Sequence, residues 1–427
     1  MNATRRLWST GGLVQSGWML MAVVLAATVL RVIAWRGLNG PIIAGDGPEY
    51  LDWAQHLAVG DFSSFRDFPL HQLYPMMIAP AFVAGLPLGQ YLFVLHLTLS
   101  VGTILCLYYA CRQFTTRGAA IVAATAAGTY PALLFWFPYV LSETPFFFFL
   151  SLFLFSLTGL LSRRRALGPR WVAFAIFAGA LLLIARPASV AILGVSAVAV
   201  AYVLLSQALG DRRARLVTTA SLLIVVGITT AALSIDTPLR SALLRYPTVA
   251  QSLWLSTRLS SSSMAEWATV LAEHRALADR FAGNQDALWD YKVREASEFI
   301  RAHPGTYTLM AVRRLASFWL PSLFSEGWSA THRLFDVALM AVLLIGTVIS
   351  MYRRRDIVRW TLLSAALALG GLTSLSQIDT DGRYRMPADL ILLMLAADGY
   401  ARVVVHAVGQ WRGRTRGGVL AARAIRQ

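Results

Sequence analysis

Long apolar runs recur along the chain and are separated by shorter polar stretches that are rich in arginine. A run of about 20 apolar residues can cross a bilayer as an α-helix. Ten such runs predict ten transmembrane helices: Gly17–Trp35, Gln90–Cys111, Gly118–Trp136, Leu141–Leu161, Trp171–Ala185, Ala188–Gln207, Leu216–Ile235, Leu334–Met351, Ile357–Ser376 and Met386–Val405. The pattern therefore indicates an all-α polytopic membrane protein.

One further apolar stretch, Leu73–Leu88, contains three prolines. Proline removes a backbone donor and ends or bends a helix, so we interpret this stretch as a juxtamembrane or re-entrant segment. The alternative is an eleventh span. We prefer ten spans because an eleventh would mix the arginine-rich segments with the acidic ones across the membrane.

Composition and charge agree with a membrane protein. Hydrophobic residues make up 57% of the 427 residues and charged residues 14%, whereas about a quarter of a soluble domain is charged. This excludes a soluble enzyme and a disordered chain. The formal net charge of +16 comes largely from arginines that ten spans place on the side of the N-terminus. The positive-inside rule makes that side the cytoplasm, so the charge needs no nucleic acid.

This topology predicts a multi-pass protein of the bacterial inner membrane with both termini in the cytoplasm. Residues 1–235 form an N-terminal transmembrane module with a catalytic outer loop at 36–89. Residues 236–333 form a helical domain on the outer face, and 334–427 form a C-terminal transmembrane module with a basic tail.

Helix signals divide the predicted outer domain. Ser263 and Asn284 are candidate caps of two helices, and Pro304 is expected to begin a third. The stretch Tyr307–Leu320 mixes apolar residues with Arg313 and Arg314 and predicts an amphipathic helix on the outer leaflet. The alternative for the whole domain is a plain cap over the membrane helices.

Acidic residues gather in the first outer loop. Asp46 lies in Gly45-Asp46-Gly47-Pro48, which predicts a turn and a helix that starts near Pro48. A carboxylate held at a helix start just above the membrane suits a general base, with Glu49 beside it. The alternative is that Asp46 only caps the helix.

Four segments together resemble GT-C membrane glycosyltransferases, in particular the group that includes protein O-mannosyltransferases and lipid A aminoarabinose transferases. They are the loop Asp46…Glu49-Tyr50-Leu51…Gly60-Asp61-Phe62, then Leu141-Ser142-Glu143-Thr144-Pro145, Ala185-Arg186-Pro187 and Asp381-Gly382-Arg383-Tyr384-Arg385-Met386-Pro387. The resemblance implies transfer of a sugar from a polyprenyl-phosphate carrier to a lipid, glycan or protein acceptor on the outer face. It assigns the catalytic acid to Asp46. Many members carry a second acid directly after it, where this chain has Gly47, so Glu49 or Asp52 would have to replace it.

Arginines and one glutamate near outer helix ends are the candidate donor-binding residues. Arg383 and Arg385 flank Tyr384, and guanidinium groups bind phosphate oxygens in pairs; Arg31 and Arg186 are further candidates. Glu143 begins a span, where an unpaired carboxylate is costly, so it is expected to face a cavity. The alternatives are arginines that snorkel to the interface and a glutamate that serves the helix dipole.

Two questions stay open at this point. His56 and His71 would have to join Asp46 or Glu49 to hold a divalent metal ion, and the sequence does not decide this. A glycan polymerase or ligase would use outer-loop arginines without Asp46, and a lipid-linked sugar transporter would place ionisable residues within its spans. The sugar and the acceptor are not specified by the sequence.

Overall fold

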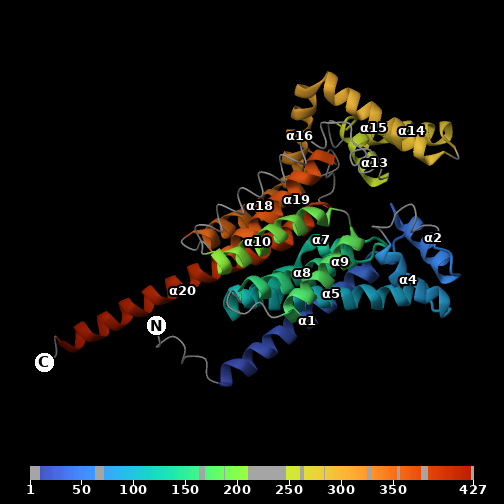
Figure 1. The fold of residues 1–427 in the computed structure, drawn as a ribbon. Coiled ribbons are helices and arrows are strands. Elements are labelled where there is room, and N and C mark those ends of the chain that lie inside the picture. The colour runs from blue at the N-terminus through green and yellow to red at the C-terminus, as the bar shows by residue number, and fades with distance from the viewer. Residues whose placement is uncertain are drawn as a thin grey trace.

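The computed structural model describes residues 10–62, 72–162, 169–186, 188–209, 247–259, 264–282, 284–324, 329–352, 356–376 and 383–424. In this part of the chain nearly every element is an α-helix, and the only β contact is an isolated bridge between Ile42 and Tyr139 (Figure 1). The predicted all-α class is confirmed.

Seven helices in the described ranges are long and apolar enough to cross a membrane. They are α1 (Thr10–Gly37), α5 (Leu88–Phe114), α8 (Glu143–Ser162), α10 (Ser189–Leu209), α18 (Ala330–Met351), α19 (Ile357–Ser376) and α20 (Met386–Ala424). Each coincides with one of the ten predicted spans. The chain is an integral multi-pass membrane protein.

The other three predicted spans have different outcomes. The run Gly118–Trp136 is divided into α6 (Arg117–Thr129) and α7 (Pro131–Phe135), with Tyr130 extended between them. A single continuous helix is therefore wrong there, because the residue before a proline is pushed out of the helical region. The fifth run is the 17-residue helix α9 (Pro169–Ala185). The seventh, Leu216–Ile235, lies outside the described residues.

The proline-rich stretch forms α4 (Leu73–Val83), a helix of 11 residues with Pro80 inside it. Such a helix is about 17 Å long, little more than half of the roughly 30 Å hydrocarbon core. An eleventh span is thus not supported. Helix α4 packs against α2 (Gly47–Ala58), the helix predicted after Asp46.

A separate group of helices lies above the bundle in Figure 1, and its members are α13 (Pro247–Ser256), α14 (Met264–Arg280), α15 (Gln285–Ala302), α16 (Pro304–Trp319) and α17 (Pro321–Phe324). Its core contains Trp254, Leu255, Leu259, Val270, Leu277 and Leu288. The Asn284 side chain accepts a hydrogen bond from the amide of Ala287 at 3.1 Å, and Pro304 begins α16, as expected. Ser263 lies outside the described residues.

Helix α16 has two faces. Met310, Arg314 and Phe318 are buried, whereas the apolar side chains of Leu309 and Val312 are exposed. The helix itself is observed, whereas its amphipathic character and its place on the outer leaflet stay predictions. The buried guanidinium of Arg314 donates to the carbonyls of Ser374 in α19 and Ser256 in α13, at 2.6 and 2.7 Å. We call α13–α17 the outer helices, after the predicted outer domain to which they belong. The hydrogen bonds of Arg314 join the outer helices to the bundle.

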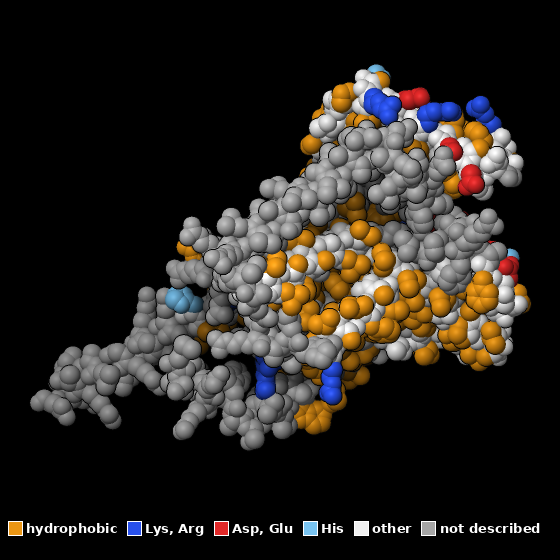
Figure 2. Space-filling view, viewed as in Figure 1, with side chains coloured by type: hydrophobic (Ala, Val, Ile, Leu, Met, Phe, Trp, Pro, Cys, Tyr) orange, Lys and Arg blue, Asp and Glu red, His pale blue; other side chains and the backbone are white. Residues whose placement is uncertain are grey.

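Hydrophobic side chains cover much of the bundle in Figure 2, while acidic and basic side chains gather on the outer helices and basic ones also at the opposite edge. Helix α1 begins, and α20 ends, at the end of the bundle away from the outer helices (Figure 1). Helix α20 runs for 39 residues, so the predicted last span and the first part of the basic tail are one helix.

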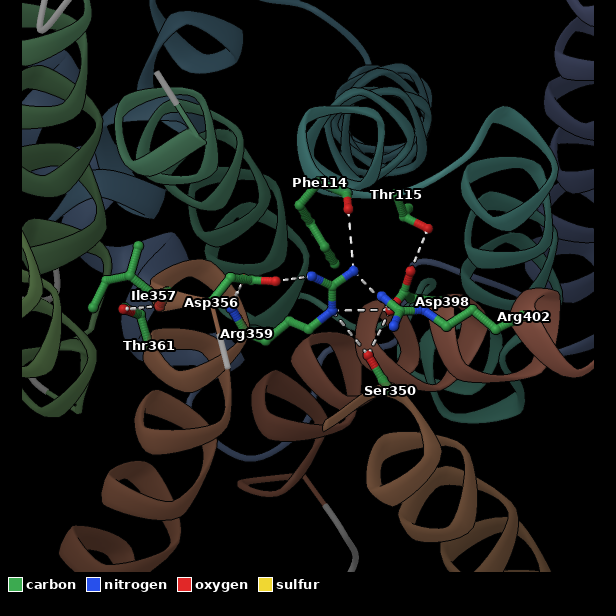
Figure 3. A network of polar contacts seen from close by, with 9 residues as sticks. All are labelled: Phe114, Thr115, Ser350, Asp356, Ile357, Arg359, Thr361, Asp398 and Arg402. Atoms are coloured by element: carbon green, nitrogen blue, oxygen red, sulfur yellow. Dashed lines mark hydrogen bonds and ion pairs between the residues drawn. The ribbon is translucent and has the colours of Figure 1, made fainter. Parts of the chain in front are cut away.

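A buried polar network joins the ends of α5 and α18 and the start of α19 to the middle of α20 (Figure 3). Asp398 of α20 accepts hydrogen bonds from Thr115 at 2.6 Å and from Ser350 at 2.7 Å, and it pairs with Arg359 at 2.9 Å. Arg359 also pairs with Asp356 and donates to the carbonyl of Phe114. Because Asp398 is 3% exposed, its charge depends on these partners.

Candidate active site

A short irregular segment, residues 137–142, precedes α8 and contacts the chain before α2. We refer to it as the connector. The amide of Ile42 donates to the carbonyl of Pro138 at 2.8 Å, and the amide of Val140 donates to the carbonyl of Ile42 at 2.9 Å. These hydrogen bonds hold the predicted catalytic loop against the segment that leads into Glu143.

Helix α2 begins very close to the connector. A Cβ atom on Gly47 would lie 2.9 Å from the carbonyl oxygen of Val140, a distance that real Cβ atoms essentially never show. Gly45 has a φ of +57°, in the left-handed region that favours glycine. The absence of a second acid at residue 47 thus has a steric reason in this chain.

Asp46 occupies the N-cap position of α2, but its side chain makes no capping hydrogen bond. Its main-chain oxygen accepts from the amide of Tyr50 at 3.1 Å, so the first turn is closed by the backbone. The Asp46 carboxylate is exposed. The alternative in which this side chain serves only as a helix cap is therefore wrong.

Glu49 is exposed one turn along, and its pKa is raised, first by partial desolvation and then by the negative charge of Asp46. His56 contacts Asp61 at 2.7 Å and lies 3.8 Å from Asp52, and His71 is outside the described residues. Within the described ranges no three His, Cys, Asp or Glu side chains group as metal ligands.

Tyr50 connects α2 to the connector from the buried side. Its side chain is 4% exposed, and its hydroxyl donates to Oγ of Ser142 at 3.3 Å. Burial raises the pKa of Tyr50, and the charge of Asp46 raises it further, while Arg186 acts in the opposite direction. Asp46 and Arg186 are thus both within electrostatic range of this one hydroxyl.

Two of the predicted arginines meet on Glu143. Its Oε1 lies 2.7 Å from Nη2 of Arg186 and 3.2 Å from Nε of Arg383. The ring of Tyr384 is 5.5 Å from the guanidinium of Arg186 and 5.2 Å from that of Arg383. Helix α8, the α9–α10 junction and the turn before α20 therefore contribute to one cluster, which brings together four of the candidate residues that the sequence named separately.

The charges of this cluster do not balance. Two guanidinium groups face one carboxylate, so the cluster has a formal charge of +1. Glu143 is 1% exposed, and within the described part of the chain its Oε2 atom has no hydrogen-bond partner. Buried polar atoms are normally hydrogen-bonded. The excess positive charge favours an anion that brings acceptor oxygens to the guanidinium groups, and the unpartnered Oε2 of Glu143 favours a hydrogen-bond donor beside it.

Arg385 points elsewhere. Its guanidinium lies 2.6 Å from Asp336 and 3.0 Å from Asp389, and it donates to the carbonyl of Trp319 at 2.9 Å. Tyr130 donates to the same Asp389 carboxylate. The structure therefore does not bring Arg385 together with Arg383, although the sequence grouped them.

Arg31 is also separate from the cluster. It is 1% exposed, and its Nη1 donates to the carbonyls of Ala27 at 3.1 Å and Gly128 at 3.0 Å. It does not snorkel to the interface, since its guanidinium joins α1 to α6 inside the bundle.

Sequence reasoning missed two residues near the cluster. They are Tyr50 and Trp136, whose ring is 6.0 Å from the Arg383 guanidinium, and neither is among the candidate site residues. A tyrosine on an otherwise apolar face is a usable signal, because its buried hydroxyl needs a partner. Nothing local to Trp136 indicates its neighbour, which lies almost 250 residues away in the sequence.

Comparison with known proteins gives a match in structure alone. No protein-family model matches the chain, and no curated protein does. The archaeal oligosaccharyltransferase AglB from Archaeoglobus fulgidus, solved with an inhibitory peptide and a dolichol-phosphate, superposes with a TM-score of 0.50 at 15% identity. The alignment covers 93% of this chain and 52% of that one.

A second structure of an Archaeoglobus fulgidus oligosaccharyltransferase, tethered to an acceptor peptide with an NVT sequon, has a TM-score of 0.49 at 14% identity, covering 92% of this chain and 50% of that one. The present chain thus spans about half the length of these proteins. The helical fold of this chain is thus similar to the fold of the part of AglB that it covers.

Proposed function

We propose that the chain is a glycosyltransferase that moves a sugar from a polyprenyl-phosphate carrier to an acceptor hydroxyl on the outer face of the bacterial inner membrane. The observation that carries this proposal is the meeting of Arg186 and Arg383 on the buried carboxylate of Glu143. Asp46, the proposed base, is the N-cap residue of α2, and Tyr50 of that helix donates a hydrogen bond to Ser142, the residue directly before Glu143. The GT-C fold, seen in an enzyme solved with a dolichol-phosphate, supports a lipid-phosphate donor.

The proposed reaction is a displacement at the anomeric carbon of the sugar. Asp46 takes the proton from the acceptor hydroxyl, and the acceptor oxygen forms a bond to the anomeric carbon. The bond from that carbon to the phosphate oxygen breaks, and its electron pair leaves with the lipid phosphate. Arg186 and Arg383 stabilise this departing charge.

The surroundings of Asp46 fit the role of a base better than that of a structural anchor. Its carboxylate is exposed and makes no helix-capping hydrogen bond, so it is available to an acceptor. Glu49, whose pKa is raised beside it, would hold a proton more readily than an ordinary glutamate. We assign Glu49 to the acceptor side, where a protonated carboxyl can donate a hydrogen bond.

The arginine asymmetry supports a site on the periplasmic side with both chain ends in the cytoplasm. Arg385 and Arg31 are proposed to act on donor binding only indirectly, by fixing the helices around the cluster. The transferred sugar, a hexose or a pentose, is to be identified by comparing membrane glycolipids of a deletion strain and its complemented parent by mass spectrometry.

Donor binding is tested with polyprenyl monophosphate as the probe, on the full chain in nanodiscs. Arg383→Ala and Arg186→Ala should each weaken probe binding about 10- to 100-fold, since a charged hydrogen bond is worth roughly 1.5–3 kcal/mol. Lysine should restore binding only partly, because it lacks the planar fork of arginine.

Arg301→Ala is the matched control, since Arg301 is exposed at the end of α15. It should bind the probe like the unmodified protein. Unchanged binding in both cluster variants would refute the donor site, and with it the proposed enzyme.

A further inference from the structure

We propose that Tyr50 is a positioning residue that couples occupancy of the Arg186–Arg383 cluster to the placement of Asp46. The juxtaposition that points to this is the hydrogen bond from the Tyr50 hydroxyl to Ser142, the residue directly before Glu143. The inference rests on the proposed function, because it concerns how the two parts of that site communicate.

The path from the arginine cluster to Asp46 is short and continuous. Glu143 binds both guanidinium groups, and Ser142 is its neighbour in the chain. Ser142 accepts the hydroxyl of Tyr50, and the amide of Tyr50 donates to the main-chain oxygen of Asp46 at 3.1 Å. Each step of this path is an ion pair, a hydrogen bond or a peptide bond between neighbouring residues.

The hydrogen bond between Tyr50 and Ser142 is buried, so its loss is not compensated by water. Tyr50 is 4% exposed and Ser142 is 2% exposed, so water does not replace the bond if it is broken. The ring of Tyr50 is fixed by the rings of Trp53 and Tyr74, at centroid distances of 5.8 and 5.5 Å. A shift of Ser142 is therefore passed to α2 rather than absorbed by a free side chain.

The other residues of the connector are held by hydrogen bonds to neighbouring segments. Ser142 is the connector residue that lies next to Glu143 in the chain. Tyr74 and His96 hydrogen-bond at 2.8 Å, and the other ring nitrogen of His96 bonds to the carbonyl of Phe137 at 2.8 Å. Ile42 pairs with the connector on both sides of Tyr139. The first half of the connector is thus anchored to α4, α5 and the loop before α2.

A donor phosphate changes the charge at the arginine cluster, which is the end of this path opposite to Asp46. It competes with the carboxylate of Glu143 for Arg186 and Arg383, and one oxygen of that carboxylate has no hydrogen bond to hold it. A displaced Glu143 moves the first turn of α8 and with it Ser142. Tyr50 then adjusts the start of α2, so that Asp46 takes its catalytic position only when the donor is bound.

Tyr50→Phe removes this coupling and little else, since the ring remains. Turnover at saturating donor should fall about 2- to 10-fold, the range that corresponds to one neutral hydrogen bond. Ser142→Ala should have the same effect, and the double variant should be no worse than either single one, because all three break the same bond. Polyprenyl monophosphate should still bind, with its affinity lowered by no more than the same 2- to 10-fold factor, because coupling between two sites is reciprocal.

Tyr91→Phe is the matched control. Its hydroxyl donates to the carbonyl of Met77 at 2.7 Å, a hydrogen bond that does not involve the connector. It should keep normal turnover. An equal loss in Tyr91→Phe, or additive losses in the double variant, would overturn the coupling and indicate general loosening.

Hydrogen exchange of α2 gives a readout that a merely structural role would not move. Polyprenyl monophosphate should slow exchange of α2 in the unmodified protein and not in Tyr50→Phe, although both bind the probe. Equal protection of α2 in both proteins would overturn the coupling alone. Absence of probe binding in the unmodified protein would overturn the proposed function and the coupling with it.

Discussion

Replacing Asp46 by asparagine separates catalysis from structure more sharply than any other single change in this chain. The substitution keeps size and shape and removes only the proton acceptor. Because the side chain is exposed and makes no capping hydrogen bond, the helix does not depend on it. The first turn of α2 is held by the main-chain oxygen of Asp46, by the buried Gly47 and by Tyr50.

The expected effect of Asp46→Asn on stability is much smaller than its expected effect on the rate of sugar transfer. A surface substitution away from structural contacts changes the free energy of unfolding by no more than about 0.5 kcal/mol. Loss of a general base lowers the rate by about 10²–10⁴, equal to about 2.7–5.4 kcal/mol of activation free energy. We therefore expect Asp46→Asn to unfold at the temperature of the unmodified protein and to transfer almost no sugar.

The assay is sugar transfer to the native acceptor in membranes at matched protein level, with thermal unfolding of the purified variant beside it. Asp61→Asn is the control, since Asp61 belongs to the same loop and pairs with His56 away from the arginine cluster. It should stay active. Near-normal transfer by Asp46→Asn would remove Asp46 from catalysis and favour a polymerase or ligase that works through arginines.

Three further predictions test the packing around the site and beyond it. Gly47→Ala should keep the protein in the membrane but lower turnover by up to about 100-fold, because the new Cβ atom displaces α2 from Val140; kinetics at matched protein level measure this. Asp398→Asn should lower the free energy of unfolding by about 1–3 kcal/mol, because Arg359 and Arg402 lose their charged contact with Asp398 while Arg359 keeps its ion pair with Asp356, and thermal unfolding in detergent checks it. Burial lowers the pKa of Lys292 to about 8, against about 10.4 in the unfolded chain. Between these values the unfolded state binds the extra proton, so the outer helices should become more stable as pH rises through this window, and Lys292→Met should abolish that rise in pH-dependent thermal unfolding.

Features that depend on local pattern were accessible from the sequence. Apolar runs specify seven of the observed long helices, and the Asn284 cap and the Pro304 helix start follow from residue type and position alone. The break at Tyr130 was missed although its signal was present, since Pro131 follows it directly. The length of the apolar run outweighed that signal in the interpretation.

Lys292, the only lysine of the sequence, is buried in a way that the hydropathy pattern does not predict. A lysine is expected on the solvent-exposed face of a helix, whereas the structure buries Lys292 on α15 beside Leu288 and Ala296. The lysine fits there because its ammonium group lies 5.0 Å from the ring centre of Trp254 and 4.8 Å from that of Trp289. Trp254 belongs to another helix, and hydropathy along one helix cannot report such a partner.

The roles of Arg383 and Arg385 show the same limit within one tripeptide. The sequence places both beside Tyr384 and so assigns both to a phosphate. Asp389 lies in the first turn of α20, four residues after Arg385, and residues at that spacing face each other. This spacing was the sign in the sequence that Arg385 pairs with a carboxylate. What the sequence lacked was Asp336 on α18, the second carboxylate that holds Arg385 inside the bundle. Because Arg385 is fixed there, the chain two residues earlier is fixed too, and Arg383 reaches Glu143. The buried arginine is thus a condition for the position of the one at the proposed donor site.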